Sequence, residues 1–252
     1  MLTPFDLHGK VAIITGSTRG IGLAIARMFQ DHGANVVISS ENIGDCDRIG
    51  RELQTLAIPA DVTDAAQLAT LVDGTVDRHG GIDILVCNAG ITGRPGPFAA
   101  VDMDDFDRVM AINLRSQVQL CNLALPHLAT RGGGSAILVS SLSGLRGNGA
   151  INAYALAKAG VAQLARNLAV EWGPRNVRVN AISPGFIRTE LSAPLLADAA
   201  FMQLRMAMTP LRRPGEVQEV AGAALFLASP AGAFVTGHNL VVDGGTLITD
   251  GS

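Results

Sequence analysis

A tyrosine and a lysine, Tyr154 and Lys158, are four residues apart in a segment whose apolar pattern predicts a helix over residues 152–172. Side chains four apart on a helix share a face and lie one above the other. A lysine ammonium beside a phenol stabilises the phenolate, which lowers a tyrosine pKa that is about 10 when unperturbed. The pair therefore predicts a general acid or base that works near neutral pH. From the spacing alone, an ordinary pair on an exposed helix face is the alternative.

A serine, Ser141, lies at the end of the strand predicted before this helix and precedes Tyr154 by thirteen residues. We expect its hydroxyl to reach the same crevice and to hydrogen-bond a substrate carbonyl. Ser143, two residues further on, is the alternative. Three polar residues between the serine and the tyrosine are candidate contacts at the mouth of the cleft: Arg146, Asn148 and Asn152.

A glycine-rich turn follows the first predicted strand and reads Gly16-Ser17-Thr18-Arg19-Gly20-Ile21-Gly22. Its glycines permit a tight turn, a close approach of backbone amides to a pyrophosphate, and close packing of the next helix on the sheet. The N-terminus of that helix supplies N–H donors and a favourable dipole for an anion. The spacing G-x-x-x-G-x-G departs from the dinucleotide fingerprint G-x-G-x-x-G, so a glycine turn without a ligand is the alternative.

Short β-rich apolar runs alternate with helix-sized segments along the whole chain. The runs are nearly continuous, which indicates parallel strands covered on both faces. We expect an α/β fold: one Rossmann-like, doubly wound parallel sheet of about seven strands, order 3-2-1-4-5-6-7, with helices on both faces. The predicted strands are Val11–Thr15, Asn35–Ser39, Leu56–Ala60 (weakened by Pro59), Asp83–Val86, Ala136–Ser140, Val177–Ile182 and Asn239–Val242. The predicted helices cover about 21–29, 68–76, 103–130, 152–172 and 216–228.

Residues 186–213 interrupt this alternation, because they are apolar and contain no strand pattern. Long insertions in compact domains are often functional, so we expect a lid over a hydrophobic substrate. A surface helix pair that packs its own apolar face is the alternative. No linker or repeat divides the chain, and residues 1–252 are expected to form a single dinucleotide-binding domain.

Polar residues and glycines gather where the predicted strands end. In an open α/β sheet, ligands bind at the carboxyl ends of the strands, near the point where the strand order reverses. The alternative is that strand ends are polar only because loops are. The residues concerned are Ser39, Ser40, Asp61, Asn88, Gly90, Ser141, Pro184 and Gly185.

The composition narrows the class of protein. The 252 residues are 48% hydrophobic and only 4% aromatic, which supports a large aliphatic core. A formal net charge of −3 gives no electrostatic footprint for nucleic acid or an anionic membrane, so the expected partners are small molecules. Three cysteines (Cys46, Cys87 and Cys121) are too far apart for a disulfide framework or a zinc site.

The N-terminal residues lack a secretory h-region, and no apolar run approaches the roughly 20 residues that span a bilayer. We therefore expect a cytoplasmic protein. The five histidines form no motif and G-x-S-x-G is missing from the sequence, which disfavours a Ser-His-Asp hydrolase and a metal site.

Together these motifs resemble those of the short-chain dehydrogenase/reductase family, over about residues 9–245. Gly16, Gly20 and Gly22 match its glycine-rich motif, and Tyr154 and Lys158 match its Y-x-x-x-K. The other matches are Asn88-Ala89-Gly90, Asn113, Ser141 and Val242-Asp243-Gly244-Gly245. Where the family often has N-N-A-G, this chain has Cys87 in the first position.

The resemblance implies NAD(P)(H)-dependent interconversion of a ketone or aldehyde and an alcohol. Tyr154 would be the proton donor or acceptor, Ser141 would hold the substrate oxygen, Lys158 would bind the nicotinamide ribose and lower the tyrosine pKa, and Asn113 would help to hold a water. It also implies a homo-oligomer, often a tetramer packed through the helices at about 103–130 and 152–172. A non-catalytic dinucleotide-binding sensor or scaffold, which needs only the glycine loop and the sheet, is the alternative.

The resemblance also implies a set of cofactor contacts. NAD enzymes of the family usually have Asp where this chain has Ser40, and NADP enzymes often have Arg where it has Glu41. Arg19 matches a position that is basic in related NADP enzymes, so NADP(H) is slightly favoured. The expected contacts are Gly16, Ser17, Thr18, Arg19, Gly20, Ile21, Gly22, Ser40, Glu41, Asp61, Val62, Asn88, Ala89, Gly90, Tyr154, Lys158, Pro184, Gly185, Ile187 and Thr189.

Overall fold

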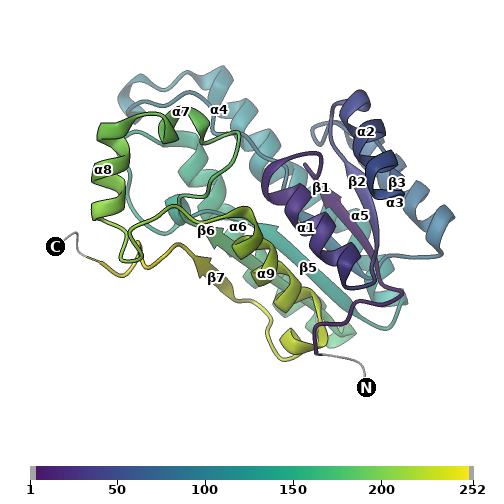
Figure 1. The fold of residues 1–252 in the computed structure, drawn as a ribbon. Coiled ribbons are helices and arrows are strands. Elements are labelled where there is room, and N and C mark those ends of the chain that lie inside the picture. The colour runs from purple at the N-terminus through teal and green to yellow at the C-terminus, as the bar shows by residue number, and fades with distance from the viewer. Residues whose placement is uncertain (1–3, 250–252) are drawn as a thin grey trace.

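All seven strands run parallel in the order β3-β2-β1-β4-β5-β6-β7 in the computed structural model, which describes residues 4–249 (Figure 1). The predicted fold class and strand order are confirmed. The strands are β1 (Val11–Thr15), β2 (Asn35–Ser39), β3 (Leu56–Ala57), β4 (Ile84–Cys87), β5 (Gly134–Val139), β6 (Val177–Pro184) and β7 (Asn239–Val242).

The central strands are aliphatic throughout because both faces of the sheet are covered. Every residue of β1 is buried, and Ile13 pairs in register with Val37 on one side and Leu85 on the other. The third strand is shorter than predicted and ends at Ala57, two residues before Pro59, which has no N–H for a strand ladder.

Helices lie on both faces of the sheet, as Figure 1 shows. Their side chains form two separate hydrophobic cores with the strands, one against α3, α5 and α6 and the other against α1 and α9. The helices are α1 (Gly20–Asp31), α2 (Ile43–Leu53), α3 (Ala65–His79), α4 (Met103–Met110), α5 (Ser116–Thr130), α6 (Asn152–Trp172), α7 (Ala193–Leu196), α8 (Ala199–Ala207) and α9 (Val217–Ala228). The sequence pattern did not single out α2, because few of its residues are apolar and only Cys46, Ile49 and Gly50 are buried.

The predicted helix over 103–130 is not continuous. A π-helical turn, Ala111–Arg115, separates α4 from α5 and carries Asn113. The wider i→i+5 turn changes which side chains face the neighbouring α6, and turns of this kind occur frequently at functional sites. Apolar periodicity does not distinguish a π turn from an α-helical one, so the sequence pattern does not predict it.

Two features are absent from residues 4–249. No helix there is long and apolar enough to cross a bilayer. No group of three or more His, Cys, Asp or Glu residues there is placed to hold a metal ion.

A buried aspartate, Asp83, fastens the amino-terminal edge of the sheet. Its carboxylate accepts hydrogen bonds from the backbone N of Val11 at 3.0 Å, from Lys10 Nζ at 3.4 Å, and from Arg131 Nη2 at 3.3 Å. The side chain is only 3% exposed. One carboxylate therefore connects the starts of β1 and β4 with the end of α5.

We expect Asp83→Ala to lower the free energy of unfolding by about 3 kcal/mol, because it leaves a buried N–H and two cations without their acceptor. Urea unfolding followed by circular dichroism measures the loss. Asp77→Ala, at an exposed position of α3, is the control and should change stability by less than about 0.5 kcal/mol. Equal effects of the two substitutions would contradict the role given to Asp83.

Candidate active site

The glycine loop and the turn after β4 are bonded to each other where the strand order reverses. Asn88 Nδ2 donates to the backbone oxygens of Thr15 and Gly16, both at 3.0 Å. Thr15 Oγ1 in turn accepts from the backbone N of Asn88 at 3.1 Å and of Ala89 at 3.2 Å. The ends of β1 and β4 thus form one rigid rim beside the crevice in which such sheets bind ligands.

The glycine loop has the shape of an anion cradle. A β-carbon on Gly22 would lie 2.2 Å from Gly16 O and 2.5 Å from Asn88 Nδ2, so only glycine allows α1 to approach the rim. Gly20 has φ +55°, and the nearest atoms to a β-carbon there belong to Thr189, at 3.8 and 3.9 Å. The first turn of α1 carries no acidic residue and no side-chain cap, which leaves its N–H groups available for an anion. These residues fit the pyrophosphate of a dinucleotide.

Ser17 and Thr18 lie within this loop with buried side chains. The hydroxyl of Ser17 donates to Ile14 O at 2.7 Å and accepts from Ser39 N at 2.9 Å. That side chain therefore holds β1 against β2. Ile21, on the first turn of α1, packs against the core that α1 shares with α9.

The end of β2 places a negative charge beside a buried hydroxyl. Ser40 is 6% exposed, and its Oγ donates to Glu41 Oε2 at 3.1 Å. The side chain of Arg19 is 68% exposed and forms an ion pair with Glu190, with 3.9 Å between Nη1 and Oε2.

Two of the predicted cofactor contacts, Asp61 and Val62, follow β3 and contact other residues of the protein. Asp61 Oδ1 accepts from the backbone N and the hydroxyl of Thr63, both at 2.8 Å. Val62 packs against the hydrophobic core that contains α3.

Three elements meet around Lys158. The lysine is 3% exposed on α6, and its Nζ donates to Val139 O at 2.7 Å. A β-carbon on Gly90 would lie 2.7 Å from Asn113 Oδ1 and 3.5 Å from Lys158 Nζ. The side chain of Asn113 pairs with the backbone of Ile91, accepting from its N at 2.9 Å and donating to its O at 2.7 Å. The turn after β4, the π turn and α6 are thus held together.

Tyr154 and Ser141 are hydrogen-bonded at the end of β5. The tyrosine ring lies one helical turn from Lys158, whose Nζ is 5.7 Å from the ring centroid. Ser141 Oγ also accepts from the backbone N of Ser143 at 3.1 Å. The structure therefore brings Ser141 to the tyrosine, while Ser143 supports the turn through its backbone.

The pKa values differ from the sequence-based expectation in one respect. Burial raises the pKa of the Tyr154 phenol, and the hydrogen bond with Ser141 offsets part of that rise. Burial lowers the pKa of Lys158 to about 8. The expected lowering of the tyrosine pKa by Lys158 is wrong for this arrangement, because desolvation dominates at the phenol and the lysine Nζ is bonded to a backbone carbonyl.

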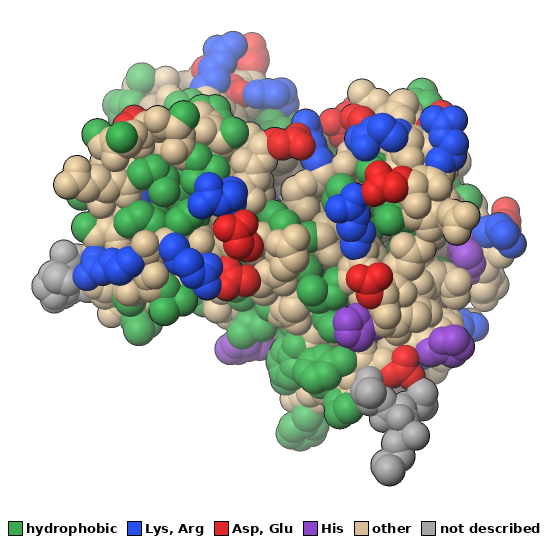
Figure 2. Space-filling model, viewed as in Figure 1, with side chains coloured by type: hydrophobic (Ala, Val, Ile, Leu, Met, Phe, Trp, Pro, Cys, Tyr) green, Lys and Arg blue, Asp and Glu red, His purple; other side chains and the backbone are tan. Residues whose placement is uncertain are grey.

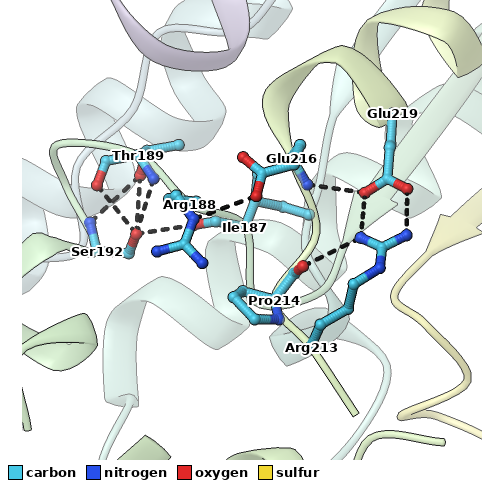
Figure 3. A network of polar contacts seen from close by, with 8 residues as sticks. All are labelled: Ile187, Arg188, Thr189, Ser192, Arg213, Pro214, Glu216 and Glu219. Atoms are coloured by element: carbon cyan, nitrogen blue, oxygen red, sulfur yellow. Dashed lines mark hydrogen bonds and ion pairs between the residues drawn. The ribbon is translucent and has the colours of Figure 1, made fainter. Parts of the chain in front are cut away.

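The segment after β6 forms a loop whose two ends are in contact, at residues 186–188 and at Gly215. Ile187 forms a parallel bridge with Gly215, Arg188 N donates to Gly215 O at 2.8 Å, and Gly215 N donates to Phe186 O at 2.9 Å. Figure 3 shows the ion pairs that flank this base, Arg188 with Glu216 at 3.1 Å and Arg213 with Glu219 at 2.6 Å.

Thr189 and Ser192 form a small hydrogen-bonded turn at the same base, with Thr189 N donating to Ser192 Oγ at 2.9 Å (Figure 3). The loop between carries α7 and α8, and hydrophobic side chains gather on the surface at this end of the molecule (Figure 2). The exposed ones include Leu191, Leu195, Leu204 and Leu211. The predicted contacts Pro184, Gly185, Ile187 and Thr189 lie at or next to the base.

Two of the polar residues expected at the cleft mouth have partners within the protein. Asn152 Nδ2 donates to Gly96 O at 3.1 Å, and Asn148 Oδ1 accepts from Ala150 N at 2.9 Å. The third, Arg146, has neither a hydrogen bond nor an ion pair with any residue from 4 to 249.

Sequence reasoning missed Arg205 on α8. Its Cζ lies 5.9 Å from the centroid of the Phe186 ring, and Phe186 packs edge to face on Phe201 at 5.5 Å. Its only signal in the sequence was a charge inside the apolar run from 201 to 208.

Known proteins resemble this chain over nearly its whole length. A family model described as enoyl-(acyl carrier protein) reductase matches residues 16–246. The cis-4-hydroxycyclohexanecarboxylate dehydrogenase of Sinomonas cyclohexanicum is 41% identical over 242 residues, which are 94% of this chain and 96% of that protein.

Solved structures share the fold of this chain. A gluconate 5-dehydrogenase from Burkholderia cenocepacia in complex with NADP and tartrate is 36% identical, with a TM-score of 0.94 over 98% of this chain and 99% of that one. A 7α-hydroxysteroid dehydrogenase complexed with NADH and 7-oxo glycochenodeoxycholic acid is 38% identical, with a TM-score of 0.90 over 96% of each chain. The chain thus belongs to the short-chain dehydrogenase/reductase family and is an NAD(P)-dependent oxidoreductase that acts on CH–OH groups.

Proposed function

We propose that this enzyme interconverts a ketone or aldehyde and an alcohol at the Tyr154 hydroxyl. The observation that carries the proposal is the hydrogen bond between Tyr154 and Ser141 at the carboxyl end of β5, with Lys158 one helical turn away. Two hydroxyl groups so placed bind one carbonyl oxygen, and the phenol is the stronger acid of the two. No observation favours a non-catalytic dinucleotide-binding sensor or scaffold, which would need none of these side chains.

The phenol of Tyr154 is protonated at neutral pH, because burial raises its pKa. It is therefore ready to donate a proton to the oxygen of a ketone. Lys158, with a pKa of about 8, is close to the pH at which it gains or loses its own proton. Asn113, which contacts the same turn as Lys158, would fix its surroundings. The bound nicotinamide supplies or accepts the hydride at the substrate carbon.

The cofactor would lie across the reversal of strand order. The N–H groups at the start of α1 and the loop from Gly16 to Gly22 would hold its pyrophosphate. Asn88, Ala89 and Gly90 would line the crevice, and Lys158 would contact the nicotinamide ribose. Pro184, Gly185, Ile187 and Thr189, at the base of the loop after β6, would complete the binding surface.

Two opposite charges would decide between NAD(H) and NADP(H). The Glu41 carboxylate is held next to Ser40, where it would accept from a ribose 2′-hydroxyl and repel a 2′-phosphate. Arg19 is engaged only in a long, exposed ion pair, which contributes little and leaves the guanidinium able to bind a phosphate. Arg19 supports the NADP(H) preference expected from the sequence, and Glu41 opposes it.

Residues 186–213 would form a lid over the substrate, since the loop is closed at its base and exposes apolar side chains. We also propose a homo-oligomer that buries apolar residues exposed on and next to α4 and on α6, among them Phe98, Met103, Leu156 and Val170. Residues 1–252 would act as one domain. The three buried cysteines are all free, which is consistent with a reducing compartment such as the cytoplasm.

Tyr154→Phe should lower kcat by at least about 100-fold, because it removes the proton that is transferred and leaves the ring in place. Reduction of a panel of ketones with NADH and NADPH measures the loss, and fluorescence titration should show that cofactor binding is retained. Ser141→Ala should also lose activity. Ser143→Ala should stay within a few-fold of the wild type, since only the backbone of Ser143 contacts Ser141. Activity that survives Tyr154→Phe would disprove the assignment.

Stability should rise with pH above about 8 because of Lys158. Its pKa is about 8 when folded and 10.5 as the unperturbed value, so between these pH values the unfolded chain binds a proton that the folded chain does not. The free energy of unfolding therefore increases through this window, by up to about 3 kcal/mol. The raised pKa of Tyr154 acts in the opposite direction, and only above a pH of about 10.

Urea unfolding of the wild type and of Lys158→Met at pH 7, 8, 9 and 10 tests this linkage. The difference in stability between the two proteins should change through the window. Lys10→Met is the matched control, since Lys10 and Lys158 are the only two lysines in the sequence. The prediction would be contradicted if the pH dependence of the free energy of unfolding were unchanged in Lys158→Met but altered in Lys10→Met.

Substitutions of the two charged residues should move cofactor preference in opposite directions. Glu41→Gln removes the repulsion of a 2′-phosphate and should raise the ratio of kcat/KM with NADP(H) to that with NAD(H) by about tenfold. Arg19→Gln should lower the same ratio. If both substitutions move the ratio in one direction, or neither moves it, other residues read the 2′ position.

A further inference from the structure

A half-buried arginine, Arg205, has no anionic partner among the residues that the structure describes. Its Nε is buried and lacks a hydrogen-bond partner. The side chain forms no hydrogen bond or ion pair with any residue of the described chain, 4–249. Its contact is instead with the Phe186 ring, which Phe201 supports from the side. Burial of a charge without a partner is costly, so a cation fixed in this way indicates a site for an anion.

Arg146 adds a second unpaired guanidinium to the same region. It is half-buried, in the loop that joins Ser141 to Tyr154. Burial is the main cause of the lowered pKa of Arg205, and the neighbouring charge of Arg146 lowers it further. Two like charges near each other destabilise the free protein, and an anion bound between them would remove that cost.

The nearby carboxylate of Asp243 is not free to neutralise these arginines. Its Oδ1 accepts from Gly245 N at 2.8 Å, and its Oδ2 accepts from Leu247 N at 2.6 Å. It is close enough to act against the lowering of the Arg205 pKa, yet its oxygens are held by the backbone. The two guanidinium groups therefore remain able to bind an anion from solution.

The position of the arginines relative to the reacting group follows from the sheet. Ser141, Phe186 and Asp243 follow the neighbouring strands β5, β6 and β7. Strands lie about 4.8 Å apart, and Phe186, whose ring Arg205 contacts, follows the strand next to that of the serine that would hold the substrate oxygen. A β-carbon on Gly185 would lie 2.7 Å from Asp243 Cα, so the ends of β6 and β7 are in direct contact.

We propose that the substrate carries a carboxylate, bound by Arg205 and Arg146, several carbon–carbon bonds away from its carbonyl or carbinol carbon. This substrate class rests on the proposed reaction at Tyr154. Guanidinium groups bind carboxylates through two parallel hydrogen bonds. The rings of Phe186 and Phe201 provide an apolar wall for the carbon chain between the two ends.

Reduction of 7-oxooctanoate and of its methyl ester tests the proposal, because the two compounds differ in the charge and share the chain. We expect kcat/KM to be at least about tenfold higher for the acid. Arg205→Gln should lower kcat/KM for the acid by about 10- to 100-fold and leave that for the ester within about threefold. Arg146→Gln should act in the same direction, and Arg205→Lys should recover part of the loss. Pyruvate, whose carboxylate adjoins the carbonyl, should be reduced poorly.

Arg51→Gln, on the exposed face of α2, is the control and should leave both rates unchanged. Equal rates for acid and ester in the wild type, or an equal loss for both in Arg205→Gln, would overturn the proposal. Failure of the proposed reaction gives a different result, in which neither compound is reduced. In that case the binding of octanoate tests the anion site. Octanoate should raise the melting temperature of the wild type and not that of Arg205→Gln. An equal shift in both proteins, or no shift in either, would also overturn the proposal.

Discussion

A parallel sheet covered on both faces imposes one constraint on everything else in this enzyme. Each parallel strand must be followed by a crossover, so the carboxyl ends of all strands meet along one edge. Asn88 fastens that edge at its centre by bonding the end of β4 to the loop after β1. The approach of α1 then depends on Gly22, where a side chain would collide with Gly16 O. The cradle for the dinucleotide follows from this packing.

The same edge contains ionisable side chains whose burial in a hydrophobic core is energetically costly. Lys158 is buried and bonded to Val139 O, and the end of β5 is held to α6 by a further bond from Ser140 Oγ to Lys158 O at 2.6 Å. Burial then sets the proton affinities: it favours the neutral lysine and the neutral phenol of Tyr154. Arg205 follows the same rule on α8, where the Phe186 ring contacts a guanidinium that has no anionic partner among residues 4–249. Charges placed in this way make the crevice responsive to a ligand.

Most of the fold could be predicted because its signals are local. Val11–Thr15, Asn35–Ser39 and Asn239–Val242 were predicted with the bounds observed, and so was the helix over 152–172, because continuous aliphatic runs and helical periodicity are strong patterns. The π turn at Ala111–Arg115 was not predicted, since it shifts a helix by one residue without changing its composition. The prediction of a lowered tyrosine pKa was wrong. The spacing places Lys158 near Tyr154 but does not predict how far burial removes each side chain from water.

The sequence by itself determined the fold class, the strand order and the residue types of the active site, since periodicity and motif spacing are properties of the chain. Only the tertiary structure decided the electrostatics. In the tertiary structure the tyrosine is hydrogen-bonded to Ser141 rather than Ser143, and the carboxylate of Glu41 is hydrogen-bonded to Ser40. Arg205 and Arg146 have no anionic partner within residues 4–249. The physical reason is that proton affinity and charge pairing depend on burial and on neighbours from distant segments, and both are created only when the strand ends and the loop after β6 come together.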